Sequence, residues 1–100
     1  MSSSGINMDS ERLSKVFNAL GNPTRLKILR LVADTKRPLH IQAVARALKM
    51  DYGAVYRHVD VLEKANLVQI FEVGRSRVLS PVHNELLDQL FTLAERIEKK

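Results

Sequence analysis

Two tyrosines and an arginine lie close together in the segment DYGAVYRHVDVLEKANLV, residues 51–68. Tyr52 and Tyr56 are the only tyrosines in the chain; they are one helical turn apart, and Arg57 follows directly. A separate apolar set repeats on another face of the same helix: Val55, Val59 and Leu62. Phenol and guanidinium groups hydrogen-bond and stack on flat rings. A helix that carries them on its outside, at its front end, is predicted to bind a partner there.

The positive charge of the chain is concentrated around the start of this helix. The 100 residues include 16 Lys+Arg and 11 Asp+Glu, a formal net charge of +5. Residues 35–58 contain five basic side chains and one carboxylate, a net charge of +4. A local excess of this kind beside the front end of a helix is typical of a surface that binds a polyanion.

Length and composition indicate one folded domain. A chain of 100 residues has no room for two full cores, and 45% hydrophobic and 27% charged residues are ordinary for a globular protein. The first eight residues, MSSSGINM, lack the basic start and apolar run of a signal peptide, and no stretch is long enough to span a membrane. We therefore expect a flexible tail at 1–8, a single domain at 9–100, and a cytoplasmic, nucleoid-associated protein.

The sequence does not indicate enzyme or cofactor chemistry. There is no cysteine, and the three histidines, at positions 40, 58 and 83, form no recognisable ligand pair. The chain shows no Ser/His/Asp constellation, no glycine-rich phosphate loop and no pair of acid and base carboxylates in a plausible cleft. We expect no catalytic residues, no cofactor and no metal site.

The hydrophobic pattern predicts five helices and one β-hairpin. Apolar residues at helical spacing predict helices over residues 9–20, from 22–24 to about 33, over 41–49, over 52–65 and over about 82–98. Residues 67–73 and 77–79 predict two strands joined by a turn at 74–76, and residues 34–38 predict a polar loop. The expected fold class is mainly α with a small β-hairpin (α+β).

Local signals mark the ends of several of these helices. Asp9 or Ser10 can cap the first helix, and Asp51 is suited to cap the helix that begins at residue 52. Asn66 can adopt the left-handed conformation that commonly closes a helix. Residues 80–81, Ser-Pro, are predicted to start the last helix.

The predicted order contains a helix-turn-helix. The short helix 41–49 is joined by a tight turn at Met50 to the longer helix 52–65, and in such units the second helix enters the major groove of DNA front end first. The hairpin tip, residues 74–77, then reads as a wing, with Arg75 reaching a neighbouring minor groove or its phosphates. We therefore predict double-stranded DNA as the partner.

The outward side chains of these elements form the predicted DNA-binding set: Gln42, Arg46, Lys49, Tyr52, Gly53, Tyr56, Arg57, Arg75 and Arg77. Arg57 is expected to contact a base or a phosphate, since a forked guanidinium fits guanine O6 and N7; the alternative is an ordinary surface arginine. The two tyrosines either touch DNA or are partly packed aromatics. The three side chains from helix 41–49 are better suited to phosphates than to bases. Gly53 would allow a close approach of the helix to DNA, and no direct contact is expected from Asp60.

The two terminal helices carry more apolar surface than a small domain can cover. Apolar side chains of helix 82–98 step by four, three and four residues, and helix 9–20 has a similar stripe. The stripe could serve the intrachain core alone, but self-association is the better interpretation. We predict a homodimer whose interface includes Leu13, Phe17, Leu86, Leu90, Leu93 and Ile97.

The segments ALGNPTRLKILRLV (19–32) and IQAVARALKMDYGAVYRHVDVLEKANLV (41–68), followed by a Gly-Arg wing, resemble the arsenic-repressor (ArsR) type winged-helix transcription regulators. The resemblance covers residues 10–97 and departs from the family at two motif positions, where Tyr56 and Asn66 stand in place of a common serine and glycine. It implies a homodimer built from the first and last helices, with two recognition helices in successive major grooves, and repression by occupying an operator.

The metal-sensing role of many family members does not carry over. Their cysteine pairs lie in the short helix before the turn, which here reads HIQAVARAL and has no thiol. Others use Asp and His ligands on the last helix, where His83 stands alone with Pro81 two residues before it. No residue pattern marks an effector pocket.

The leading hypothesis is a sequence-specific, dimeric transcription regulator that acts as a repressor on a palindromic site. The alternative is an architectural, chromatin-like DNA-binding protein with little sequence preference. A third reading is a protein-interaction module that has lost DNA binding. The charge concentrated at 35–58 argues against this third reading.

Overall fold

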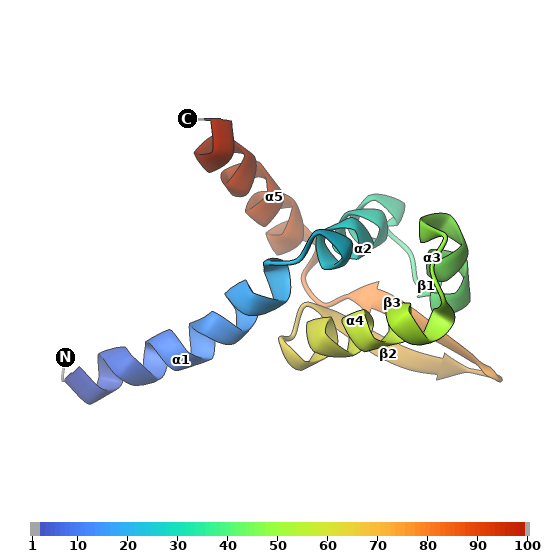
Figure 1. Ribbon diagram of the computed structural model, residues 1–100, viewed down its shortest axis with the longest axis horizontal. Coiled ribbons are helices and arrows are strands. Elements are labelled where there is room, and N and C mark those ends of the chain that lie inside the picture. The colour runs from blue at the N-terminus through green and yellow to red at the C-terminus, as the bar shows by residue number, and fades with distance from the viewer. Residues whose placement is uncertain (1–2, 100) are drawn as a thin grey trace.

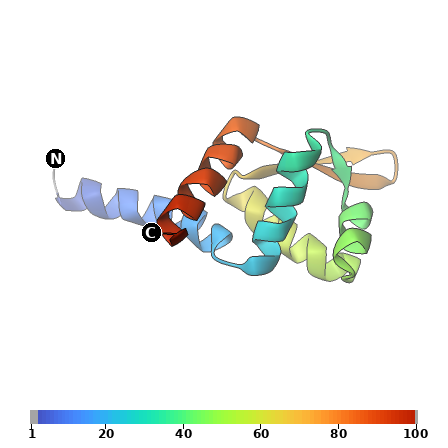
Figure 2. The ribbon, with the colours of Figure 1, turned by 90° about the horizontal axis from the view of Figure 1, so that it is seen from above.

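The computed structural model describes residues 3–99, and this part of the chain forms five helices and one small antiparallel sheet. The elements follow one another as α1 (Ser3–Leu20), α2 (Pro23–Thr35), β1 (Leu39–His40), α3 (Ile41–Leu48), α4 (Tyr52–Lys64), β2 (Val68–Val73), β3 (Ser76–Pro81) and α5 (Asn84–Lys99). In Figures 1 and 2, α2, α3, α4 and the sheet form one body, from which α1 and α5 project. The predicted α+β fold class is confirmed. Among the described residues, no helix is both long enough and apolar enough to cross a bilayer.

The core lies where the apolar faces of α2, α3 and α4 meet the sheet. Its largest fully buried side chains are Ile28, Leu29 and Val32 of α2, Ile41 and Val44 of α3, Val55, Val59 and Leu62 of α4, Val68 and Leu79 of the sheet, and Leu87 of α5. The inner face of α4 predicted from the helical period is therefore confirmed. The polar side chains of this helix are left on the opposite face.

The sheet has three strands in the order β1-β3-β2, all antiparallel. The prediction of a two-stranded hairpin was therefore incomplete, because Leu39 and His40 form a short strand that pairs with Leu79 and Val78. Two residues are too few to show a period of their own, so β1 exists only through its pairing with β3. One consequence is that His40 lies beside the wing.

The prediction that Pro81 begins the last helix was wrong. Pro81 ends β3, opposite Val68, and α5 begins three residues later at Asn84. The Ile70 N–H turns away from β3 and binds Glu63 Oε2 at 3.0 Å. Because hydrogen-bonded pairs alternate along an antiparallel ladder, the Pro81 nitrogen also faces away from β2, where β1 does not reach. The missing N–H of proline therefore costs the sheet no hydrogen bond.

Helix α1 begins at Ser3 and not at Asp9 or Ser10, so residues 3–8, which were expected to form a flexible tail, are helical. Residues 1–2 lie outside the described part of the chain. The serine-rich segment lacks the apolar period that marks a buried helix. Once a helix has nucleated, however, each further residue is added at little cost.

Two other helix ends show how the sequence sets boundaries. Asn22 Oδ1 accepts hydrogen bonds from the N–H groups of Thr24 (2.9 Å) and Arg25 (3.1 Å), and Pro23 takes the first helical position of α2. Asn66 has a φ of 63° after α4, which confirms the predicted left-handed residue. Its N–H binds Glu63 O, and the next N–H, of Leu67, binds Leu62 O.

Candidate nucleic-acid interface

Three residues join α3 to α4 in a tight turn. Lys49 takes the left-handed conformation, with a φ of 56°, and its N–H binds Arg46 O at 3.2 Å. The N–H of Met50 binds Ala45 O at 2.9 Å. These bonds close the C-terminus of α3, so the chain reverses and α4 can begin at Tyr52. The predicted helix-turn-helix is confirmed, and Lys49 is the residue of the turn that takes the left-handed conformation.

The outer face of α4 presents the side chains that the sequence placed there. Tyr52 is 41% exposed, Gly53 and Arg57 are exposed, and Tyr56 is half-buried. The two tyrosine rings are stacked, with 6.3 Å between their centroids and an angle of 16° between their planes. The front end of α4 therefore offers two phenols and one guanidinium to a partner.

Asp51 occupies the N-cap position of α4, as predicted, but its carboxylate accepts no capping hydrogen bond. The exposed carboxylate is therefore not bound to the first turn of the helix. The N–H groups of the first turn receive no hydrogen bond from Asp51. They form the positive end of the helix dipole, which points toward the same region as the tyrosines.

A cleft of about 350 Å³ separates the front ends of α3 and α4 from the wing tip. It is lined by His40, Gln42, Ala43, Arg46, Tyr52, Arg75, Ser76 and Arg77. The structure thus brings together predicted DNA-binding residues from three separate elements. Three arginines face this cleft and no carboxylate does.

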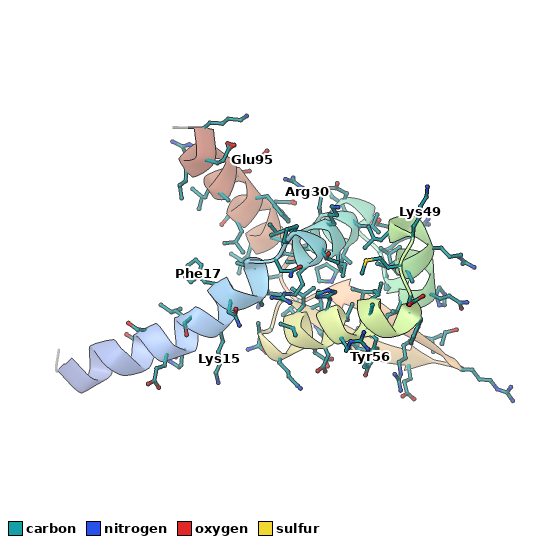
Figure 3. All side chains as sticks on the ribbon, viewed as in Figure 1. Lys15, Phe17, Arg30, Lys49, Tyr56 and Glu95 are labelled. Atoms are coloured by element: carbon teal, nitrogen blue, oxygen red, sulfur yellow. The ribbon has the colours of Figure 1, made fainter. Side chains whose placement is uncertain are left out.

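Two residues differ from the sequence-based picture of this face. His40 lines the cleft but was not predicted, because its position beside the wing depends on the unpredicted strand β1. Lys49 does not line the cleft, and Figure 3 shows it and Tyr56 on opposite sides of the helix-turn-helix. Gly53, Tyr56 and Arg57 do not line the cleft either, although they belong to the outer face of α4. The only nearby signal in the sequence was Pro38, which favours extended geometry at the preceding residue, Arg37.

The wing is joined to α4 through Arg77. Its guanidinium carbon lies over the Tyr56 ring, 4.8 Å from the ring centroid. Tyr56 is thus a partly packed aromatic, which is one of the two alternatives left open for it, and it lies on the outer face of α4. Arg75, at the exposed tip, is one of the cleft arginines and has no such ring contact among the described residues.

The carboxylates in the rear half of α4 are engaged within the chain. Asp60 forms an ion pair with Lys64 at 2.9 Å, and this hydrogen bond raises the pKa of the Lys64 ammonium above its ordinary value. Glu63 accepts the hydrogen bond from the Ile70 N–H. These two carboxylates are thus set back from the front of the helix, where Arg57 lies, and Asp51 at the N-cap is the carboxylate that remains there.

Comparisons with known proteins agree on the class of this chain. The family model described as a helix-turn-helix domain matches residues 20–69. An uncharacterised HTH-type transcriptional regulator of Methanocaldococcus jannaschii is 32% identical over an 87-residue alignment that covers 77% of this chain and 90% of the relative. The chain belongs to the helix-turn-helix transcription regulators, and the relatives described below support its resemblance to the ArsR type. This is a class of DNA-binding regulators and not of enzymes.

Further relatives of the regulator support this assignment. A transcriptional repressor SmtB homolog of Synechocystis is 24% identical over 90% of this chain and 67% of its own length. The homodimeric winged helix-turn-helix DNA-binding domain of a possible ArsR-family regulator from Mycobacterium bovis superposes with a TM-score of 0.82 at 23% identity, covering 99% of this chain and 88% of that one. NolR of Sinorhizobium fredii superposes with a TM-score of 0.77 at 23% identity, covering 95% and 92%. The winged-helix fold is confirmed.

Arg25 links three helices of the regulator at the back of this interface. From α2, its Nε donates to Ala19 O at 2.7 Å and its Nη2 to Asn18 O at 3.0 Å, which satisfies carbonyls at the end of α1. Its Nη1 lies 3.3 Å from Nδ1 of His58 in α4. A guanidinium only donates, so His58 Nδ1 accepts and the imidazole is neutral with its proton on Nε2. Burial, together with the nearby charges of Arg25 and Arg57, lowers the pKa of His58.

Within residues 3–99, no three His, Asp or Glu side chains come together in an arrangement that could hold a metal ion. His83 is exposed just before α5, and its side chain lines a shallow pocket with α1 and the end of α4. His40 and His58 lie in separate environments, beside the wing and beside Arg25.

The neutral state of His58 predicts a pH-dependent stability. Its pKa in the folded chain is below the ordinary value of 6.5, so the unfolded chain takes up a proton first as the pH falls. We expect the free energy of unfolding to be unaffected by this group above pH 6.5 and to decrease as the pH falls below it. Urea unfolding at a series of pH values measures the effect.

The variant His58→Gln keeps an acceptor for Arg25 but cannot titrate, so its stability should fall less on acidification. His83→Gln, which changes an exposed histidine, serves as the matched control. A pH profile of His58→Gln that overlays the profiles of wild type and control would contradict this account.

Proposed function

We propose that the regulator binds double-stranded DNA sequence-specifically, with the front of α4 in the major groove and the wing on a minor groove or its backbone. One observation carries the proposal. The exposed phenol, guanidinium and amide groups of α3, α4 and the wing tip converge on one face, around a cleft with three arginines and no carboxylate. Such a surface matches a helix-turn-helix docked on a polyanion.

Within this proposal the residues have different tasks. Arg57 and Tyr52 read bases, since they are exposed at the front of α4. Gln42 and Arg46 hold phosphates from α3, and Lys49 holds a phosphate at the far side of the turn. Arg75 reaches a phosphate or the minor groove from the wing tip, and Gly53 lets the helix backbone approach closely.

We further propose that the regulator acts as a homodimer joined through α1 and α5. Five of the six side chains predicted for this interface are large apolar groups left exposed by the single chain: Leu13, Phe17, Leu86, Leu93 and Ile97. An apolar cavity of about 520 Å³ lies between the two helices and is lined by Phe17 and Ile97, among others. Figure 3 shows Phe17 on the side of α1 that faces α5. Exposed apolar surface of this extent favours association.

The sixth predicted interface residue, Leu90, differs from the others. It is partly buried and packs against the intrachain core, so it serves the fold of the monomer as well. The description of the Mycobacterium bovis domain as homodimeric supports the dimer. With two recognition helices related by a two-fold axis, half-sites about one helical turn apart are expected.

Repression by occupying an operator is the proposed mode of action, in the cytoplasm on nucleoid DNA. It is supported by the Synechocystis relative, which is described as a transcriptional repressor. The proposal is tested by titrating the protein against a random DNA pool and its own upstream region at two salt concentrations. Recovery of a two-fold symmetric site would support it. Uniform binding that collapses as salt rises would favour an architectural DNA-binding protein instead.

Arg57 and Arg46 should affect binding in different ways. Arg57→Ala is expected to cost about 1–3 kcal/mol on the recovered site and to relax its sequence preference, because a base contact is lost. Arg46→Ala should weaken binding to all sequences alike and reduce the slope of affinity against salt by about one unit. Fluorescence anisotropy with specific and random duplexes measures both.

Lys27→Ala is the control, since it removes the same charge from an exposed position on α2 outside the cleft. If Arg57→Ala bound the recovered site as tightly as Lys27→Ala, base reading by α4 would be wrong.

Gly53→Ala should change stability and DNA affinity in opposite directions. A Cβ at this position would meet only the Arg57 guanidinium, at 3.8 Å, so the free protein accepts it and the helix gains about 0.5–1 kcal/mol. On DNA the same methyl occupies the space for close approach, and we expect about a tenfold loss of affinity. Thermal unfolding measures the stability, and titration of a DNA duplex with the same protein preparation measures the affinity. Unchanged affinity would remove Gly53 from the interface.

Ile97→Glu should convert the dimer into monomers. Ile97 is 76% exposed in the single chain, so a carboxylate there leaves the monomer intact but cannot be buried against a partner. Sedimentation velocity measures the mass, and circular dichroism checks the fold. Glu98→Gln, at an exposed neighbouring position, is the control. A dimeric Ile97→Glu variant would rule out this part of the interface.

A further inference from the structure

Three side chains connect the front of α4 to the wing. Tyr52 stacks on Tyr56, and the guanidinium of Arg77 lies over the Tyr56 ring at 4.8 Å. Tyr56 comes from α4 and Arg77 from β3, so this contact crosses between the helix and the hairpin. We refer to these side chains as the Tyr52–Tyr56–Arg77 cluster.

Among the described residues, one side-chain hydrogen bond also joins the hairpin to α4, near its base. Glu63 of α4 accepts the hydrogen bond from the Ile70 N–H on the free edge of β2. Glu63 and Tyr56 are seven residues apart, which is about two helical turns or 10 Å along α4. One link near the base leaves the direction of a hairpin adjustable, whereas two links separated by this distance fix it.

Beyond Ile70 the hairpin has little else to hold it in place. Residues 71–77 are all exposed, and the register of the strands pairs Glu72 with Arg77 and Val73 with Ser76 near the tip. The Arg77 contact is thus the outermost attachment of the wing to the helix among the described residues. Figure 3 shows Tyr56 where α4 passes alongside the hairpin.

We propose that Tyr56 and Arg77 clamp the wing to the recognition helix before DNA is bound, so that Tyr56 is a positioning residue that acts through the wing. This rests on the proposed function. A guanidinium held over a ring still has N–H groups that can donate to a phosphate. Arg77 therefore enters the complex already oriented, and α4 and the wing meet the duplex at a set separation.

The clamp depends on the ring and not on the phenol hydroxyl, which separates it from direct reading by Tyr56. Tyr56→Phe keeps a ring beneath Arg77 and should lower DNA affinity less than Tyr56→Leu does. Tyr56→Leu keeps apolar bulk but loses the ring, and should lower affinity about two- to fivefold, the factor expected for an exposed cation–π contact. If Tyr56→Phe alone lowers affinity as much as Tyr56→Leu, the hydroxyl reads DNA and the clamp assignment is overturned.

The free protein offers a direct test that needs no DNA. The chain has no tryptophan and only these two tyrosines, so its near-ultraviolet circular dichroism between the phenylalanine and tryptophan bands reports on the cluster. Arg77→Met should change this tyrosine signal and speed amide hydrogen exchange in the outer hairpin about two- to fivefold. Arg75→Met removes the same charge two residues away without touching the ring, and should leave the tyrosine signal unchanged.

The outcomes separate the clamp from the proposed function. An Arg77→Met protein with wild-type tyrosine signal and hydrogen exchange would show that the contact is absent in solution, which overturns the clamp. Wild-type DNA affinity in Tyr56→Leu would show that the contact does not serve recognition, which overturns the clamp as well. Failure of the wild-type protein to bind any duplex would refute the proposed function, while the measurements on the free protein would still decide whether the clamp exists.

Discussion

Burial of one apolar stripe on α4 determines most of what this molecule presents to solvent. Val55, Val59 and Leu62 are completely buried, and removing such side chains from water contributes about 1.5–3 kcal/mol each. That burial fixes the rotation of the helix about its own axis. Tyr52 and Arg57 are thereby held on the opposite face, whatever their own interactions contribute. The reading surface is therefore a consequence of packing on the other side of the helix.

The same argument explains which features the sequence could predict. A helical period is visible in the residue order, so the inner and outer faces of α4 and the stripes of α1 and α5 followed from it. The capping positions at Asp51 and Asn66 also followed, because capping depends on residues close in sequence. Strand β1 could not be predicted from the sequence, since two residues show no hydrophobic period. Its existence depends on pairing with β3, about forty positions later in the chain. The extension of α1 to Ser3 was missed for a related reason, as that segment shows no buried face.

The site was predictable as a set of residues but not as an arrangement. Period and charge placed Gln42, Arg46 and Arg75 among the DNA-binding candidates, and the structure gathers them around one cleft. The contacts that join elements were not visible in the sequence: Arg77 lies 21 positions from Tyr56, and Arg25 lies 33 positions from His58. The residues that form such contacts between elements have no fixed separation in the sequence. Lys49 shows the converse, since it shares a helical face with Gln42 and Arg46 by spacing yet takes a left-handed backbone conformation that ends the helix.

The guanidinium of Arg25 connects the helix proposed for dimerisation, α1, with the helix proposed for DNA binding, α4. It is bonded to the last carbonyls of α1 and to the imidazole of α4, so the end of the projecting helix and the reading helix share one rigid joint. If the regulator dimerises through α1, as proposed, a change in the orientation of α1 on dimerisation would be transmitted to α4 through these hydrogen bonds. By thermodynamic reciprocity, DNA binding at α4 would change the free energy of dimerisation by the same amount as dimerisation changes the free energy of DNA binding. In the proposed dimer, binding to DNA and association of the two subunits would then be thermodynamically coupled through Arg25.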